Sequence, residues 1–227
     1  MRQRMPGLAP RMVMWLDLFR VQEGCDWEEG FLATVSQHTR RNVRVGLRSE
    51  LTCSEAEDPE EIRAAFEVIE ANGRSQGYAT RNWQEFGQPL IEQVHRGQAV
   101  ILAVRHHGRL VGVHYAVLAG RRWSYLMGGT ERTDENLRVG HFTLWSAIRN
   151  ARQRGLLGFN LDSAGTSGVN RFKMGFHPQT VELIPPQELV LQPLRYQACA
   201  KLLPAVQRHR RMLATMTQHL GFFRNRD

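Results

Sequence analysis

Residues 157–176 read LGFNLDSAGTSGVNRFKMGF, and the fold is inferred outward from this stretch. It joins a short apolar strand, 157–161, to an aspartate, a glycine-rich loop and a lysine near aromatic side chains. An ammonium group between Phe172 and Phe176 is partly desolvated, and a compact cation there can neutralise a phosphate or steady a developing oxyanion. Lys173 is also one of only two lysines among 30 basic residues, so it is the first candidate for chemistry; the alternative is an ordinary surface lysine.

The residues before this stretch alternate between strand and helix patterns. Runs 99–105 and 110–118 are rich in β-branched residues and predict a hairpin, since His106-His107-Gly108-Arg109 separates them. A third strand, 123–127, ends in Gly128-Gly129, where tandem glycines allow a ligand to approach the backbone. A helix over 137–154 follows. The paired histidines have no cysteine or carboxylate at a useful spacing, so we expect no metal site.

The first third of the chain predicts one strand and three helices. The strand covers 13–18, and Asp26 caps a helix that begins at Trp27 and continues to about residue 47. Helices over 58–73 and 82–96 follow, the first with a proline in its first turn. Arginines 40, 44 and 48 form one stripe on the first helix, which is either a solvated face or a contact surface for phosphate or carboxylate.

Composition excludes several classes of protein. The chain has 227 residues, of which 42% are hydrophobic and 23% charged, which is typical of a globular protein and excludes a disordered tail or a membrane bundle. The net charge of +8 favours a polyanionic partner. Residues 49–194 are nearly neutral, with 15 basic and 16 acidic side chains, while 195–227 hold seven basic and one acidic. A basic fold for DNA across the whole chain is therefore not expected.

The cysteines and the start of the chain point to a reducing compartment. The three cysteines are far apart and form no Cys-x-x-Cys pair, so neither a disulfide framework nor a zinc site is indicated. The apolar patch within residues 1–19 is interrupted by prolines and charges, and no apolar run is long enough to span a bilayer. We expect a cytoplasmic protein.

Four segments in this order resemble one known family. They are residues 39–44 (TRRNVR), 74–78 (RSQGY), 125–129 (YLMGG) and 171–176 (RFKMGF). Together they are similar to the Fem-type branch (FemAB/FemX-like) of the GNAT acyltransferase superfamily, mainly its second GNAT-like half, over about residues 13–190. The resemblance implies an α/β (α+β) fold with a central, mixed, mostly antiparallel sheet flanked by helices, which splays where acyl donor and acceptor amine meet.

The resemblance also implies an activity and a set of site residues. The expected reaction moves an acyl or aminoacyl group from acyl-CoA or aminoacyl-tRNA to a primary amine, in a small molecule or a cell-wall precursor of peptidoglycan or cell-envelope biosynthesis, without a tightly bound cofactor. Lys173 and Phe172 match the phenylalanine–lysine pair to which phosphate binding and oxyanion support are attributed. The remaining candidates are substrate-binding Arg44, Arg74, Tyr78, Tyr125 and Asp162, and donor-binding Arg138 and Gly140.

Two departures from the family pattern keep other functions open. Fem-type enzymes pair two GNAT-like halves, so a homo-oligomer or a partner could supply a first half. Residues 136–141 (NLRVGH) carry only part of the Arg/Gln-x-x-Gly-x-Gly/Ala loop that holds coenzyme A pyrophosphate. Tyr125 and Asp162 could equally be a packed tyrosine and a capping aspartate. The alternative function is a non-catalytic module that binds RNA, such as tRNA, or an acidic partner through its basic flanks.

These observations divide the chain into three parts. They are an N-terminal segment with an edge strand, 1–25, a GNAT-like acyltransferase domain, 26–192, and a basic C-terminal helical tail, 193–227. The tail pairs leucines with arginines, which allows peripheral contact with a membrane, although packing on the body is the simpler expectation.

Overall fold

The computed structural model describes residues 12–21, 26–77, 80–131, 136–162, 167–184 and 190–208. Seven strands form one sheet in the order β2-β3-β4-β5-β6-β1-β7. All neighbouring strands are antiparallel except β5 and β6, which are parallel. The strands are β1 (Met12–Asp17), β2 (Leu51–Glu55), β3 (Ala99–His106), β4 (Arg109–Leu118), β5 (Arg122–Thr130), β6 (Gly158–Asn160) and β7 (Gln179–Glu182). The sheet is therefore mixed and mostly antiparallel, as expected.

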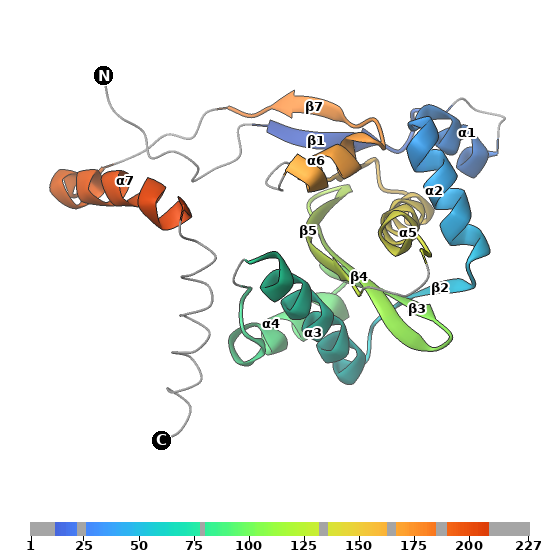
Figure 1. Cartoon of the computed structure of the whole chain (residues 1–227), viewed down its shortest axis with the longest axis horizontal. Helices are drawn as coiled ribbons and strands as arrows, with labels where there is room; N and C mark the ends of the chain where they lie inside the picture. Colours follow the sequence, from blue (N-terminus) through green and yellow to red (C-terminus); the bar gives the residue numbers. More distant parts are fainter. Residues whose placement is uncertain are drawn as a thin grey trace.

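Helices cover both faces of this sheet. The sheet curves around α5, with α1 and α2 beyond it, while α3 and α4 lie on the opposite face (Figure 1). The helices are α1 (Trp27–Thr34), α2 (Gln37–Arg48), α3 (Pro59–Gln76), α4 (Trp83–His95), α5 (Val139–Gln153), α6 (Ser167–Met174) and α7 (Pro193–Arg208).

Burial on both faces explains the continuous apolar runs of the central strands. On β3, Val100 and Leu102 point to the core beneath α1, α2 and α5, and Ile101 and Ala103 point to the core beneath α3 and α4. Alternation along a strand sends neighbouring side chains to opposite faces, so both sets must be apolar. Trp145 of α5 is fully buried in the first core.

Local caps set the helix ends. Asp58 accepts hydrogen bonds from the backbone N–H groups of Glu60 and Glu61, with Pro59 in the first turn of α3. The single helix expected from Trp27 to residue 47 is two helices. Val35 is extended, and Ser36 caps α2 by accepting from the N–H of Thr39.

Three further expectations need correction. β1 is expected at an edge but lies between β6 and β7, so residues 12–17 belong to the interior of the sheet. Helix α6, which the sequence pattern did not predict, begins in the glycine-rich segment and includes Lys173. The tail helix is described only as α7, and within this range the expected packing on the body is not seen: α7 stands apart in Figure 1, and Leu194 and Leu202 are exposed.

Candidate active site

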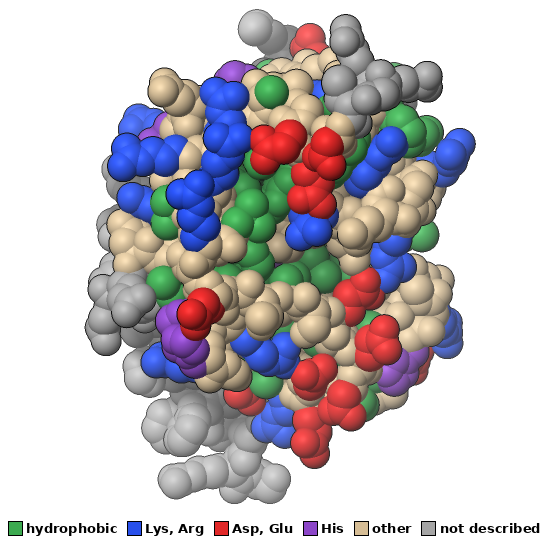
Figure 2. Space-filling model, turned by 90° about the vertical axis from the view of Figure 1, so that its right-hand side faces the viewer, with side chains coloured by type: hydrophobic (Ala, Val, Ile, Leu, Met, Phe, Trp, Pro, Cys, Tyr) green, Lys and Arg blue, Asp and Glu red, His purple; other side chains and the backbone are tan. Residues whose placement is uncertain are grey.

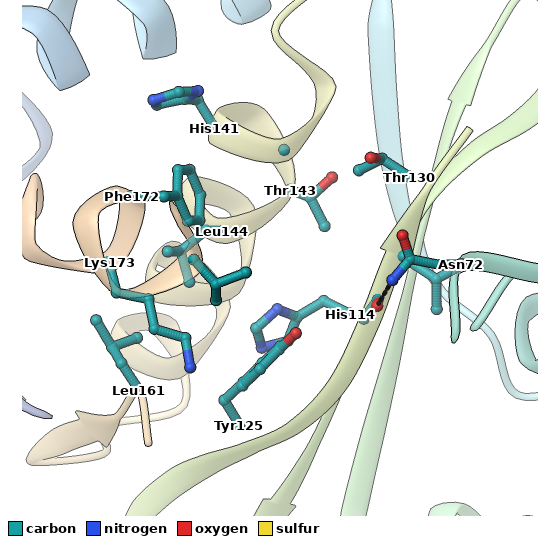
Figure 3. Close-up of a pocket in the computed structure, with 15 residues that line it drawn as sticks. Asn72, His114, Tyr125, Thr130, His141, Thr143, Leu144, Leu161, Phe172 and Lys173 are labelled. Carbon is teal, nitrogen blue, oxygen red and sulfur yellow. Dashed lines mark hydrogen bonds between the residues drawn. The ribbon is translucent and has the colours of Figure 1, made fainter. Parts of the chain in front are cut away.

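A cavity of about 310 Å³ lies beside the place where β5 and β6 stop pairing. The two strands pair only from Arg122 to Ser124 of β5, whereas β5 continues to Thr130. The sheet therefore opens here, as the family resemblance implies. This central cavity is lined by Asn72, Val113, His114, Tyr125, Gly128, Gly129, Thr130, Gly140, His141, Thr143, Leu144, Leu161, Val169, Phe172 and Lys173 (Figure 3).

Lys173 extends from α6 into the central cavity and is only 5% exposed. Its Nζ lies 4.7 Å from the centroid of the Tyr125 ring and donates a hydrogen bond to the backbone oxygen of Asp162 at 3.3 Å. Burial lowers the pKa of Lys173 below its ordinary value, and Asp162 offsets part of this shift. The ammonium is held by a carbonyl and an aromatic face, so its charge is incompletely compensated and can be directed at a ligand.

The turn that ends α6 fixes the position of Lys173. Gly175 packs so closely against α2 that a Cβ atom there would lie 2.2 Å from Thr39 Oγ1. The backbone N–H of Ser36 donates to the carbonyl oxygen of Gly175 at 2.9 Å. The guanidinium of Arg20 donates to the carbonyl oxygens of the two residues that follow, Phe176 and His177. The sequence RFKMGF is therefore anchored on the C-terminal side of the lysine.

Asp162 contributes its backbone to the site. It adopts the left-handed conformation, with φ at 56°, and its N–H donates to Asn160 Oδ1 at 2.9 Å. A non-glycine residue in this region carries a conformational cost of about 1 kcal/mol or more. The surrounding contacts hold this conformation, and the Asp162 carbonyl accepts the Lys173 ammonium.

The glycines of β5 open one wall of the cavity. Tyr115 pairs with Met127 and Ala116 pairs with Tyr125, which leaves Leu126 as the extra residue of a β-bulge. A Cβ atom at Gly129 would lie 2.9 Å from the carbonyl oxygen of Val68 in α3. Larger residues cannot occupy this position without displacing α3, so the tandem glycines allow a close approach of helix and strand.

Two more side chains fix this wall. On the α3 side, Asn72 Nδ2 donates to the carbonyl oxygen of Gly128 at 3.2 Å. On the helical side, His141 lies edge-on to Phe172, with ring centroids 4.9 Å apart. Burial first, then His38 and Arg138, lower the pKa of His141 to about 4, so its ring is neutral near pH 7. The buried Asn42 lies with its Nδ2 3.3 Å from His141 Nε2 and 2.9 Å from His38 Nε2.

A second, larger hollow lies on the other side of α5. This groove of about 570 Å³, named here the β2 groove, opens on the face shown in Figure 2, where hydrophobic side chains form a hollow bordered by basic and acidic groups. Its charged groups are paired: Arg149 with Glu28 at 2.8 Å, and Glu55 with Asn150 and Arg154. It is lined by Leu47, Leu51, Thr52, Cys53, Ser54, Glu55, Leu102, Phe142, Ser146, Arg149, Asn150 and Gln153.

The structure brings some of the expected site residues together and leaves others apart. Lys173, Phe172, Tyr125 and Gly140 line the central cavity, and Asp162 contacts Lys173 through its carbonyl.

The expected arginines do not line the cavity. Arg44 is exposed and pairs with Glu29 at 2.7 Å, and Arg74 is exposed beside Glu70. Arg138 is the left-handed residue that precedes α5. Arg44, Arg74 and Arg138 are not among the residues that line the central cavity, and their substrate- and donor-binding roles stay predictions. Tyr78 lies outside the described residues.

Sequence reasoning missed Asn72, His114 and His141. His114 is a single polar residue inside the apolar run 110–118, and that interruption is the signal that could have found it. Among the described residues, no group of three His, Cys, Asp or Glu side chains could hold a metal ion. No helix in the described ranges is long and apolar enough to cross a bilayer.

Comparison with known proteins extends this picture. The family described as "Acetyltransferase (GNAT) domain" matches residues 31–174, while no curated protein sequence matches the chain. The crystal structure of FemX has a TM-score of 0.70 at 15% identity and covers 84% of this chain and 64% of that one.

Two other solved structures share the fold less closely. The C-terminal domain of a putative lysylphosphatidylglycerol synthetase from Agrobacterium fabrum has a TM-score of 0.52 at 15% identity, covering 74% of this chain and 57% of that one. An aminoglycoside acetyltransferase from an uncultured soil metagenomic sample, in complex with sisomicin, has a TM-score of 0.50 at 10% identity, covering 64% and 99%.

The chain spans less than two thirds of the length of FemX and of the Agrobacterium domain. At these identities the likeness concerns the fold, and it confirms the GNAT-like, Fem-type architecture expected from the sequence. The family match covers the sheet from β2 to β6, α5 and α6, which is more than half of the chain and includes Lys173. The chain therefore belongs to the acetyltransferase (GNAT) domain family.

Proposed function

We propose that the protein is an N-acyltransferase that moves an acyl group from a coenzyme A thioester to a primary amine. The observation that carries this proposal is Lys173, a buried ammonium that projects into the central cavity where the sheet opens. Lys173 is the one charged side chain among the described residues that line this cavity. A lone desolvated cation favours a carbonyl oxygen that gains negative charge during the reaction.

The proposed reaction needs three events at the cavity. The amine nitrogen of the acceptor attacks the thioester carbonyl, and the carbonyl oxygen becomes an oxyanion beside the Lys173 ammonium. The C–N bond forms, the C–S bond breaks, and coenzyme A leaves as thiolate. The proton released from the amine nitrogen passes to the thiolate or to water. Phe172 packs against His141 and shapes the wall of the cavity.

The start of α5 is the part of the cavity wall that we assign to binding the acyl donor. Gly140 lies in its first turn and lines the cavity, and the first N–H groups of a helix lack partners within the helix. Such groups suit the phosphates of coenzyme A. The acceptor is a primary amine, with cell-envelope precursors as the class suggested by the resemblance to Fem-type enzymes.

The test is an acyl-transfer assay read by mass spectrometry. Purified protein is incubated with acetyl-, succinyl- and longer acyl-CoA and a panel of primary amines, and separately with charged tRNA. An acylated amine with release of coenzyme A supports the proposal. Transfer from charged tRNA alone would replace the thioester with an ester donor. No transfer and no donor binding in either arm would contradict it.

A second candidate is a non-catalytic module that binds RNA or an acidic partner through its basic flanks. The position of α7 favours it, because this basic helix stands apart from the body and exposes Leu194 and Leu202 (Figure 1). Salt-dependent binding of tRNA without any acyl transfer would support this candidate. Loss of that binding when residues 193–227 are removed would assign it to the tail.

A further inference from the structure

His114 of β4 is a buried histidine whose Nε2 atom has no hydrogen-bond partner among the described residues. The residue is 3% exposed, and its ring lies 4.9 Å from the ring of Tyr125 and 5.5 Å from that of Phe159. The Nε2 atom itself is buried as well. A buried polar atom without a partner costs about 1–3 kcal/mol, so its presence calls for an explanation.

The His114 side chain is part of the wall of the central cavity. His114 lines that cavity together with Lys173, and in Figure 3 the two side chains approach each other from β4 and α6 beside Tyr125. The residue opposite His114 on β5 is Gly128, which carries no side chain to cover the ring. A Cβ atom at Gly128 would lie 3.1 Å from the Tyr125 hydroxyl, so the space beside the imidazole depends on this glycine.

The surroundings also decide what His114 can do. Burial and then the Lys173 ammonium lower the pKa of His114 to about 3, so the ring is neutral at physiological pH. A neutral imidazole carries one N–H group and is a weak base when its pKa is this low. Toward a carbonyl oxygen, which only accepts, such a ring acts as a hydrogen-bond donor, and this is a recognised use of a histidine with a lowered pKa.

We propose that the neutral His114 ring carries its proton on Nε2, that this Nε2–H and the Nζ of Lys173 together form the oxyanion site of this protein, and that both donate to the carbonyl oxygen of the acyl donor. This inference rests on the proposed acyl transfer and adds the second donor to it. A carbonyl oxygen accepts two hydrogen bonds, and it offers no proton. It therefore fits two converging donors in a cavity whose described lining holds no carboxylate. The ligand class is a thioester or ester carbonyl.

The charge balance of the step is consistent with this assignment. When the amine attacks, the electron pair of the C=O bond moves to oxygen, and the oxyanion forms next to one cation and one neutral donor. When the C–S bond breaks, the pair returns and the carbonyl reforms. No proton is transferred to or from His114, so the imidazole remains neutral throughout.

The first arm of the test compares three variants in the acyl-transfer assay. His114→Leu removes the donor and is expected to lower kcat about 10²–10³-fold with little change in KM for the donor. His114→Gln places an amide N–H near the position of Nε2 and is expected to recover most of that loss. His107→Gln, an exposed histidine at the hairpin tip, is the matched control and keeps wild-type kcat. Full activity of His114→Leu would overturn the proposal.

Stability separates this role from a structural one. Leucine is apolar and of similar volume, so it removes the free-energy penalty of a buried nitrogen without a hydrogen bond. The Tm of His114→Leu is therefore expected to equal or exceed that of the wild type. A variant that is less active because it is less stable would show a lowered Tm, and His114→Gln would then fail to restore kcat. That pair of results would overturn the proposal.

The second arm does not need turnover. A coenzyme A ketone analogue, in which a methylene group separates sulfur from the carbonyl, is added to protein labelled with ¹⁵N-histidine. Binding is measured by calorimetry, and the Nε2–H signal of His114 is expected to move downfield in the complex. Binding without that movement contradicts the role of His114. Absence of binding contradicts the proposed donor, and the inference then falls with the proposed function.

Discussion

The central cavity and the β2 groove lie on opposite sides of α5 and differ in how their polar groups are satisfied. The groove is larger, about 570 Å³ against about 310 Å³, yet Arg149 and Glu55 in it are held by ion pairs and hydrogen bonds. The cavity holds a lysine with no ion pair among the described residues and a histidine with a bare nitrogen. The cavity therefore suits a ligand because its polar groups lack some of their hydrogen-bond or ion-pair partners, and its smaller volume does not decide this.

One helix serves both hollows. Gly140, His141 and Thr143 of α5 line the cavity, while Phe142 and Ser146 line the groove. Residues on a helix turn by about 100° each, so neighbours in sequence reach different sides. A change on one face of α5 can therefore be compared with a change on the other in the same element.

The largest difference between the central cavity and the β2 groove is expected when the lysine of the cavity is replaced. Lys173→Met is expected to lower kcat at least about 10²–10³-fold, equivalent to about 2.7–4 kcal/mol of transition-state stabilisation, with the fold intact. The matched control is Lys201→Met, the only other lysine, which is exposed on α7 and is expected to keep full activity. Near-normal turnover of Lys173→Met would remove Lys173 from the mechanism.

The close approach of α3 to β5 offers a second test. Gly129→Ala places a Cβ atom 2.9 Å from the carbonyl oxygen of Val68, and overpacking of this kind costs about 1–3 kcal/mol of stability. Chemical denaturation measures the change. Gly168→Ala is the control, because none of the described residues outside its own helical turn places an atom within 4 Å of its Cβ position, and it is expected to be neutral or slightly stabilising. Equal effects at both positions would show that the approach at Gly129 is not tight.

Lowering the pH is expected to reduce the stability of the folded protein through the two neutral histidines of the cavity. His114 and His141 have folded pKa values lowered to about 3 and about 4, so below pH 6.5 the unfolded chain binds protons that the folded chain does not. Stability is therefore fully present above about pH 6.5 and falls as the pH drops towards those values. The slope approaches about 1.4 kcal/mol per pH unit for each group.

His114→Leu is expected to flatten this decline, because one of the two groups is then absent. Denaturant titrations between pH 7 and pH 4 follow the difference, and His107→Gln is the control expected to follow the wild type. Parallel curves for wild type and His114→Leu would show that the imidazole titrates normally.

The smallest effect is expected in the β2 groove. Arg149→Met removes the ion pair with Glu28, but both side chains are more than a third exposed, so we expect about 0–1 kcal/mol of destabilisation. Acyl transfer should be unchanged. If this variant lost activity as Lys173→Met does, the groove would belong to the site and the distinction between the two hollows would fail.

The sequence made Lys173 the first candidate for a site residue because chemistry and composition agreed there, and the structure places it, buried, in the lining of the central cavity. A lysine in an arginine-rich chain, placed next to aromatic residues, is unusual in its own segment and needs no knowledge of distant contacts. The elements with strong local signals, such as the capped α3 and the β3–β4 hairpin, were predicted for the same reason.

Other features depend on contacts between residues far apart in the chain. The place of β1 between β6 and β7 is decided by pairing with residues more than 140 positions away. Helix α6 has weak local propensity and is held by the packing of Gly175 on α2. His114 was missed because one histidine in an apolar strand is also typical of a core residue, and its bare nitrogen is visible only in three dimensions.

The burial of Lys173 gives the protein a chemical reporter of its own. The chain has two lysine side chains, one exposed on α7 and one at 5% exposure in the cavity. An amine-reactive label therefore meets two very different ε-amines, and Lys201 provides the internal standard for Lys173. A donor that occupies the cavity would slow acylation of Lys173 without affecting Lys201. Peptide mass spectrometry of the labelled wild-type protein thus ranks donors by how far each slows the labelling of Lys173, before any substrate is known.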